Sequence, residues 1–257
     1  MKKIFTSDFD GTLYFYKEEV KLPPESVEKI RAYQAAGNLF GLCTGRQVGG
    51  LTPFIRGFVE PDFMITASGA NIVGRDGTPI FEGSVAPDVA DAIIREVRPK
   101  GNRMTLDVGG EICVFEKMEF PGKYYVIHGL QDCPPGKIHE VSIHTESLEE
   151  AAAMSRHINE TYGDRVEAFQ NVIEIDIAPK GCSKGHGVEV IRERFSHAET
   201  CRIYGIGDSV NDLPLIQAAD VSYTFPYAPE ELQEKADKVV DNIRIALDDS
   251  MADPLEG

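Results

Sequence analysis

Runs of apolar residues alternate with helical patterns at both ends of the chain. The apolar runs predict strands at Lys2–Phe9, Leu39–Thr44, Phe63–Ala67 and Arg202–Ile206. Helices are predicted at Pro24–Ala36, which has proline near its start, and from about Asp212 to Ala219. Because strands and helices alternate, we expect an α/β fold built on a parallel sheet.

The middle of the chain, residues 83–180, has a different pattern, in which strands follow one another in pairs. A hairpin is predicted where Gly109-Gly110 separates the alternating runs Arg103–Val108 and Glu111–Glu116. Ser147 and Glu150 predict a capping box for a helix that ends near Tyr162. The other predicted strands are Ile138–His144, Arg165–Ala168 and Val172–Ile177. We therefore expect a core domain of residues 1–82 and 181–257, with an inserted α+β domain of residues 83–180 as a lid.

Two carboxylates follow the first predicted strand, in the sequence Asp8-Phe9-Asp10-Gly11-Thr12. Alternation along a strand directs Asp8 and Asp10 to the same side, where like charges repel unless a cation lies between them. A divalent metal would supply that cation. The same segment also fits an Asx-rich turn, because Asp-Gly is common wherever a chain reverses. The pentapeptide alone leaves both interpretations open.

Three more motifs lie at predicted strand or helix ends. Gly207-Asp208-Ser209-Val210-Asn211-Asp212 follows the fourth predicted strand, and Thr44-Gly45-Arg46 follows the second. Ser183-Lys184-Gly185 opens an amphipathic helical segment and adds a cation. Ligands of open parallel sheets bind beyond the carboxyl ends of the strands, so we expect these motifs to surround one site.

The four motifs in this order resemble those of the haloacid dehalogenase superfamily, and specifically of its Cof-type phosphatases with a type IIB cap. The resemblance covers most of the chain. It implies a Rossmann-like parallel sheet with helices on both faces and an inserted α+β cap. It also implies an enzyme that uses Mg²⁺ to hydrolyse small phosphomonoesters, commonly sugar phosphates, through an aspartyl-phosphate intermediate.

The resemblance assigns a role to each matching residue. Asp8 would be the nucleophile, and Asp10 the general acid and then the general base. Mg²⁺ would be bound by Asp8, the backbone carbonyl of Asp10 and Asp208, while Ser209 and Asp212 would orient metal-bound waters or the lysine. The residues expected to hold the phosphoryl group are Phe9, Thr44, Gly45, Lys184 and Asn211.

Some assignments stay open at this stage. Lys184 is preferred to Lys180 because it matches the motif and begins the helix, and Lys180 is interpreted as a solvated hinge residue. Arg46 would either bind substrate or cap a helix, and it is left outside the catalytic set. The aromatic segment Tyr14-Phe15-Tyr16 would form a wall against the leaving group or pack the cap onto the core.

The bulk properties exclude several classes of protein. A net charge of −16 and a pI near 4.8 disfavour binding to nucleic acids and to anionic membranes. The sequence contains no apolar run as long as the roughly 18 residues of a membrane span. Five scattered cysteines without Cys-x-x-Cys spacing predict reduced thiols, and a cytoplasmic location is expected. The sequence does not fix the substrate or the oligomeric state.

Two rival interpretations share the aspartates and the lysine. A phospho-accepting signalling domain would gather them at the tips of a parallel sheet, but it needs only about half this length and no lid. A catalytically silent protein that binds sugar phosphates would keep the same fold, although every catalytic position of the motif is filled here. Accumulation or turnover of an aspartyl-phosphate distinguishes these alternatives.

Overall fold

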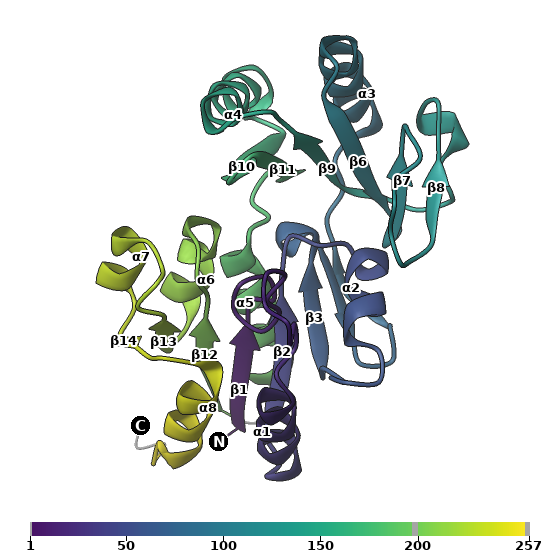
Figure 1. The fold of residues 1–257 in the computed structure, drawn as a ribbon. Helices are drawn as coiled ribbons and strands as arrows, with labels where there is room; N and C mark the ends of the chain where they lie inside the picture. The colour runs from purple at the N-terminus through teal and green to yellow at the C-terminus, as the bar shows by residue number, and fades with distance from the viewer. Residues whose placement is uncertain (1, 197–199, 255–257) are drawn as a thin grey trace.

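The computed structural model describes residues 2–196 and 200–254, in two modules that each contain one sheet (Figure 1). The predicted domain limits at residues 1 and 257 lie outside these ranges. The strands of the lower module, in spatial order, are β14 (Lys238–Val239), β13 (Val221–Thr224), β12 (Cys201–Ile206), β1 (Lys2–Ser7), β2 (Leu39–Cys43), β3 (Phe63–Thr66), β4 (Asn71–Gly74) and β5 (Pro79–Glu82). The strands of the upper module are β10 (Val166–Asn171), β11 (Glu174–Pro179), β9 (Ile138–His144), β6 (Arg103–Val108), β7 (Glu111–Val114) and β8 (Tyr124–Val126).

Helices cover both faces of the lower sheet, as the sequence predicts. Phe5 of β1 packs in the hydrophobic cluster of one face and Ile4 in that of the other, because successive side chains alternate along a strand. The first face is covered by α1 (Pro24–Ala35), α2 (Val48–Ile55) and α8 (Ile243–Ala252). The second is covered by α5 (Lys184–Ser196) and α6 (Leu213–Ala218), and α7 (Glu230–Lys235) packs beside α6.

The lower sheet is parallel from β14 to β3 but antiparallel at its other edge, where β4 pairs with β3 and β5 with β4. The four predicted strands, β1, β2, β3 and β12, pair in parallel as expected, whereas the antiparallel strands β4 and β5 were not predicted. Ala67, Ser68 and Gly69 follow β3 with φ values of 49°, 51° and 91°, and this left-handed stretch reverses the chain at once. A parallel neighbour would need a crossover of about a dozen residues, which this short connection lacks.

The order of the strands reverses beside β1. The chain runs from β1 to β2 and β3 on one side, whereas β12 and β13 lie on the other. The carboxyl ends of β1 and β12 therefore border the crevice where open α/β sheets bind their ligands. The upper module is placed above this edge (Figure 1).

The sheet of the upper module has one apolar and one polar face. The apolar face packs against α3 (Pro87–Val97) and α4 (Leu148–Tyr162). The predicted hairpin is present as β6 and β7, and Gly109 and Gly110 have the positive φ values, 62° and 84°, that a tight two-residue turn requires. The structure has β5 ending at Glu82 and β11 at Pro179, while the domain boundaries at 82/83 and 180/181 stay predictions.

Several predicted element ends shift in the structure. The first strand ends at Ser7, because Leu13 and Tyr14 donate to the carbonyl of Phe9 and close a turn there. Val172, predicted to begin a strand, is an exposed turn residue with φ 55°, since the hairpin of β10 and β11 reverses at this point. The predicted capping box is only half formed: Ser147 Oγ accepts from the Glu150 N–H, but the Glu150 carboxylate accepts from Glu146.

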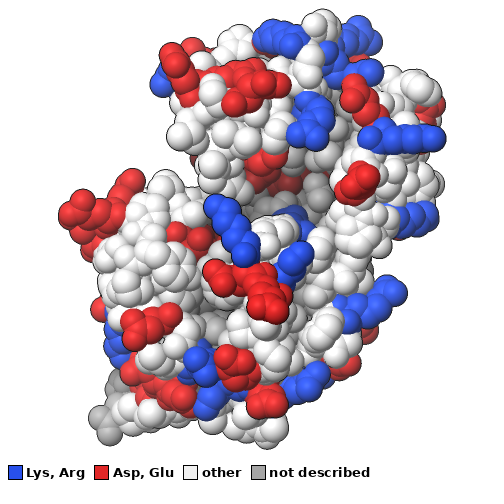
Figure 2. Space-filling model, in the orientation of Figure 1, with Lys and Arg blue, Asp and Glu red and all other residues white. Residues whose placement is uncertain are grey.

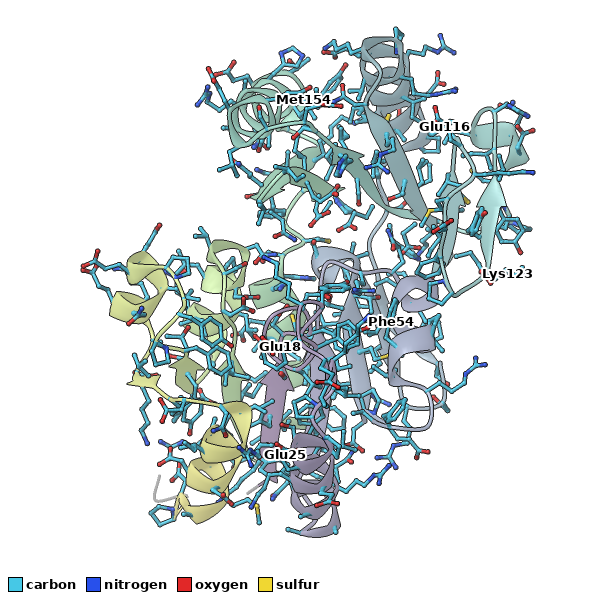
Figure 3. The ribbon with its side chains drawn as sticks, viewed as in Figure 1. Glu18, Glu25, Phe54, Glu116, Lys123 and Met154 are labelled. Atoms are coloured by element: carbon cyan, nitrogen blue, oxygen red, sulfur yellow. The ribbon has the colours of Figure 1, made fainter. Side chains whose placement is uncertain are left out.

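The hairpin of β6 and β7 is one of the places where the modules meet. The N–H of Gly49, in the first turn of α2, donates to the carbonyl of Gly110 at 2.9 Å. Phe54 lies on α2 (Figure 3), and its ring centroid lies 6.2 Å from that of Phe120 in the upper module. Within the described residues, each helix is too short or too polar to cross a membrane.

Candidate active site

Asp8 lies directly after β1, at the crevice of the lower sheet. Its N–H donates to the carbonyl of Ile206 at 2.9 Å, which ties the end of β1 to β12. Its side chain is buried, and Oδ1 lies 2.6 Å from Nζ of Lys184. Gly11 adopts φ 86°, and a Cβ there would lie 2.4 Å from Oδ2 of Asp208. Only glycine therefore lets the loop after β1 approach the second acidic loop this closely.

The second acidic loop, after β12, is held by hydrogen bonds from both sides. Thr12 Oγ1 donates to Oδ1 of Asp208 at 2.7 Å, which explains the threonine of the first motif. Oδ2 of Asp212 accepts from the N–H groups of Asp208 and Ser209, each at 3.0 Å. As a result, carboxylate oxygens of Asp8, Asp208 and Asp212 lie within 4.8 Å of one another.

Lys184, the first residue of α5, provides the ammonium group of this cluster. Its side chain is buried and pairs with both Asp8 and Asp212. Burial opposes a charge on this lysine, but the charges of Asp212 and Asp8 raise its pKa well above the usual range. Lys180 is exposed, lies outside the pocket and pairs with Glu167 at 3.5 Å.

The donor set fits a hard divalent cation. Burial, followed by the charge of Asp212, raises the pKa of Asp8 well above its ordinary value and that of Asp208 to about 6. Three carboxylates lie near one ammonium group, so part of the negative charge in this buried cluster is not compensated. Mg²⁺ prefers such oxygen ligands. Asp8 and Asp208 have oxygens available for it, whereas both oxygens of Asp212 are already bound to Lys184 and to backbone amides.

Asp10 shares the pocket with Asp8 but has a different partner. Nε of Arg46 donates to one of its carboxylate oxygens at 2.7 Å, and Nη2 donates to the other at 2.8 Å. The guanidinium group also lies over the ring of Phe54, 4.5 Å from its centroid. The sequence interpretation left Arg46 out of the catalytic set. Its place in the Thr-Gly-Arg motif was the available signal, but the pairing with Asp10 depends on how two distant loops pack.

The remaining predicted residues lie around the same crevice. Thr44 is buried, and its Oγ1 accepts from the Arg46 N–H at 3.1 Å, whereas Asn211 lines the pocket and bonds to the Ser209 hydroxyl. Phe9 stacks on Tyr14 at 5.1 Å inside the hydrophobic cluster. Its side chain is therefore directed away from the pocket, and only its backbone is left to meet a phosphate.

A pocket of about 490 Å³ joins these residues to the upper module. Tyr16 lines the pocket, whereas Tyr14 packs in a hydrophobic cluster whose residues all belong to the lower module, rather than between the cap and the core. The upper module contributes polar side chains to the lining, which are Thr105, Ser142, Asn171, Glu174 and Asp176. The space-filling view shows the hollow between the modules, with acidic side chains on the wall below the upper module (Figure 2).

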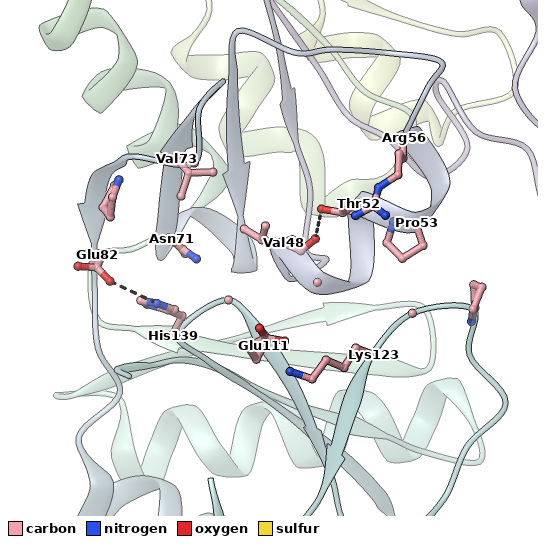
Figure 4. Close-up of a pocket in the computed structure, with 17 residues that line it drawn as sticks. Val48, Thr52, Pro53, Arg56, Asn71, Val73, Glu82, Glu111, Lys123 and His139 are labelled. Carbon is pink, nitrogen blue, oxygen red and sulfur yellow. Dashed lines mark hydrogen bonds and ion pairs between the residues drawn. The ribbon is translucent and has the colours of Figure 1, made fainter. Parts of the chain in front are cut away.

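A second, larger cavity of about 740 Å³ lies between the modules at the start of α2 (Figure 4). It shares no lining residue with the pocket of Asp8 and Asp10. His139 lines it and its Nε2 lies 3.8 Å from a Glu82 carboxylate oxygen, at the connection between the modules. The catalytic candidates therefore gather in the other cavity.

Comparisons with known proteins agree with this geometry. Residues 5–244 match the model of the haloacid dehalogenase-like hydrolase family. An HMP-PP phosphatase from Klebsiella pneumoniae is 21% identical over 242 residues, which cover 91% of this chain and 87% of the relative. A haloacid dehalogenase-like hydrolase from B. subtilis superimposes with a TM-score of 0.83 at 17% identity and covers all of both chains. Another, from Bacteroides thetaiotaomicron, has a TM-score of 0.80 at 19% identity and covers 97% of this chain and 99% of the other. The family predicted from the four motifs is thus confirmed, and the chain belongs to the haloacid dehalogenase-like hydrolases.

Proposed function

We propose that this chain is a Mg²⁺-dependent phosphatase that hydrolyses small phosphomonoesters, sugar phosphates among them, through an aspartyl-phosphate on Asp8. Its family makes it a phosphoric monoester hydrolase. The observation that carries the finer proposal is the buried carboxylate of Asp8, which lies between Lys184 and Asp208 and shares a pocket with Asp10.

The arrangement supports Asp8 rather than Asp10 as the nucleophile. Asp8 is fixed by a backbone hydrogen bond to β12 and by the ammonium of Lys184, so its carboxylate needs little reorganisation before attack. A carboxylate oxygen of Asp8 would attack phosphorus, and the bond between phosphorus and the leaving oxygen would break. Mg²⁺, held by Asp8, the Asp10 carbonyl and Asp208, would neutralise charge on the phosphate.

Asp10 is suited to transfer the protons. In the first step it would protonate the leaving oxygen, and in the second it would accept a proton from the water that attacks the aspartyl-phosphate and regenerates Asp8. Arg46 donates to both Asp10 oxygens, and each of these oxygens keeps a second lone pair that could take a proton. A phosphoryl oxygen of the substrate would compete for the same guanidinium group.

Lys184, Thr44 and Asn211 would hold the phosphoryl oxygens as charge develops on them. Nζ of Lys184 already donates to Asp8 and to Asp212. Its third N–H is therefore left for the substrate. We propose that the inserted segment, residues 83–180, acts as the cap, because its polar side chains close the pocket opposite Asp8. Water would thereby be limited around the reacting phosphate.

The test is phosphate release from sugar phosphates, nucleotides and an aryl phosphate, with and without Mg²⁺. Asp8→Asn should abolish release while circular dichroism shows a folded protein, since asparagine keeps the shape of the side chain but is not a nucleophile here. The matched control is Asp241→Asn, an exposed position of the lower module, which should keep full activity. Residual turnover by Asp8→Asn above one percent would contradict the covalent mechanism. No release by the folded wild type would favour the silent binding protein.

A further inference from the structure

The sheet of the upper module presents an acidic surface to the catalytic pocket. On β11, β9 and β6, Asp176 pairs in register with Ser142, and Ser142 with Thr105. Asp107 and Glu140 pair in the next row on the same face. We call the face that carries these five residues the polar face. It lies opposite the apolar face that packs on α3 and α4.

Asp176 is a member of the polar face that lies close to the catalytic loops. It lines the pocket with Asp8 and Asp10, and a Cβ built on Gly45 would lie 2.9 Å from its Oδ2. Gly45 follows Thr44 in the loop expected to hold the phosphoryl group. The leaving group of a substrate whose phosphate is bound there would therefore extend toward Asp176.

Charge in this part of the pocket is not balanced. The lysine and arginine side chains among its lining residues are Arg46 and Lys184, and both pair with carboxylates of the lower module. Within residues 2–196 and 200–254, no ion pair involves Asp176. The other carboxylate that the upper module adds to the lining, Glu174, pairs with His144.

Among the described residues, those behind Asp176 offer it little hydrogen bonding. Ser142 Oγ donates to Oε1 of Glu140 at 3.3 Å and also lies within hydrogen-bonding reach of Asp176, although it has one proton to donate. Oδ2 of Asp107 is fully buried and has no hydrogen-bond partner in the described chain, whereas the buried carboxylate of Glu140 has the hydroxyls of Ser142 and Ser68 within reach. Burial and the charge of Glu174 raise the pKa of Asp176 to about 7, although Ser142 and the more distant charge of Lys184 act in the opposite direction. A buried carboxylate with so few hydrogen-bond donors is stabilised most by a partner that is cationic or rich in donors.

We propose that Asp176 is a specificity-determining residue that selects phosphomonoesters whose leaving group carries an ammonium group, and that it disfavours esters with a second anionic group. This inference rests on the proposed phosphatase activity and deepens it. An ammonium group beside Asp176 would supply the cation that the polar face lacks, in the way that Lys184 does for Asp8. A second phosphate or carboxylate would meet like charge in a poorly solvated site.

The test compares three hexose derivatives that share a phosphate at the same carbon: glucosamine 6-phosphate, glucose 6-phosphate and 6-phosphogluconate. Each is assayed as a competitor of p-nitrophenyl phosphate hydrolysis, so that its apparent inhibition constant is measured whether or not it is turned over. The wild type should bind the amine at least tenfold more tightly than the neutral sugar and the carboxylate most weakly. Asp176→Asn should reduce the amine preference to within about threefold.

A matched control separates this role from a general effect on the cap. Glu167→Gln makes the same change of charge on the same sheet face, outside the pocket, and should leave both the activity and the tenfold preference unchanged. A preference that survives in a folded, active Asp176→Asn protein would overturn the proposal, as would a wild type that prefers the neutral or anionic sugar. Absence of p-nitrophenyl phosphate hydrolysis by the wild type would instead count against the proposed function.

Discussion

The buried carboxyl of Asp107 makes the stability of the upper module depend on pH. Its side chain is fully buried on β6, where Oδ1 accepts from the Gly110 N–H at 2.7 Å and Oδ2 has no partner among the described residues. Burial raises its pKa from 3.8 to about 7. The folded protein therefore binds a proton that the unfolded chain has released. Stability from this group is complete below pH 4 and is lost as the pH rises through 7.

The magnitude follows from these two pKa values. Each unit of pKa difference corresponds to about 1.36 kcal/mol, and nearly two units of the difference act between pH 5 and pH 8. The wild type should lose roughly 2–3 kcal/mol of unfolding free energy over this interval because of Asp107. Asp107→Asn keeps an acceptor for Gly110 but carries no charge, so it should lack this loss.

Urea unfolding, followed by circular dichroism at pH 5 and pH 8, measures the difference. The stability of Asp107→Asn relative to the wild type should be higher at pH 8 than at pH 5, by roughly 2–3 kcal/mol. Asp164→Asn, at an exposed position of the same module, is the control and should follow the wild type at both pH values. A difference below about 1 kcal/mol between the two pH values would refute the reasoning, because it would mean that Asp107 is solvated in the fold.

Three other perturbations test the site. Asp10→Ala should slow the hydrolysis of alkyl phosphates far more than that of aryl phosphates, because aryl leaving groups need little protonation. The measurement is kcat/KM over a series of leaving groups, and equal losses across the series would contradict the role of Asp10 as general acid. Lys184→Met leaves Asp8 and Asp212 buried without their ammonium partner, so it should lower the unfolding free energy by about 3–5 kcal/mol. Added Mg²⁺ should recover part of this loss. An unfolding free energy that the substitution does not change would contradict the pairing. Gly69 has φ 91°, and Gly69→Ala would place a Cβ 2.0 Å from the backbone oxygen of Ser183. Its melting temperature should therefore be well below that of Gly77→Ala, a position with φ 80° and open space around it. Equal melting temperatures would show that the contact with Ser183 is unimportant.

Local sequence patterns were sufficient for much of the lower module. Strand and helix positions near β1, β2, β3 and α1 follow from apolar runs, prolines and glycines, and the structure shifts their ends by one or two residues. The antiparallel edge was not predicted, since it depends on three consecutive left-handed residues, two of which, Ala67 and Ser68, are not glycine. Nothing in their local propensity indicates that conformation, and the fold stabilises it in part by hydrogen bonds from the Ala67 and Ser68 N–H groups to the carbonyls of Arg46 and Thr44.

The sequence by itself determined the family and the chemical groups of the site. A motif such as Asp-x-Asp-Gly-Thr encodes its loop locally, and parallel strands bring their carboxyl ends to one edge, so the meeting of Asp8 with Asp208 follows from order and spacing. Only the tertiary structure decided which groups pair. Arg46 joins Asp10, Asp212 joins Lys184, and Asp176 of the upper module comes to face Gly45. These contacts connect loops that are far apart in the chain, and their geometry depends on how two modules dock rather than on any local pattern.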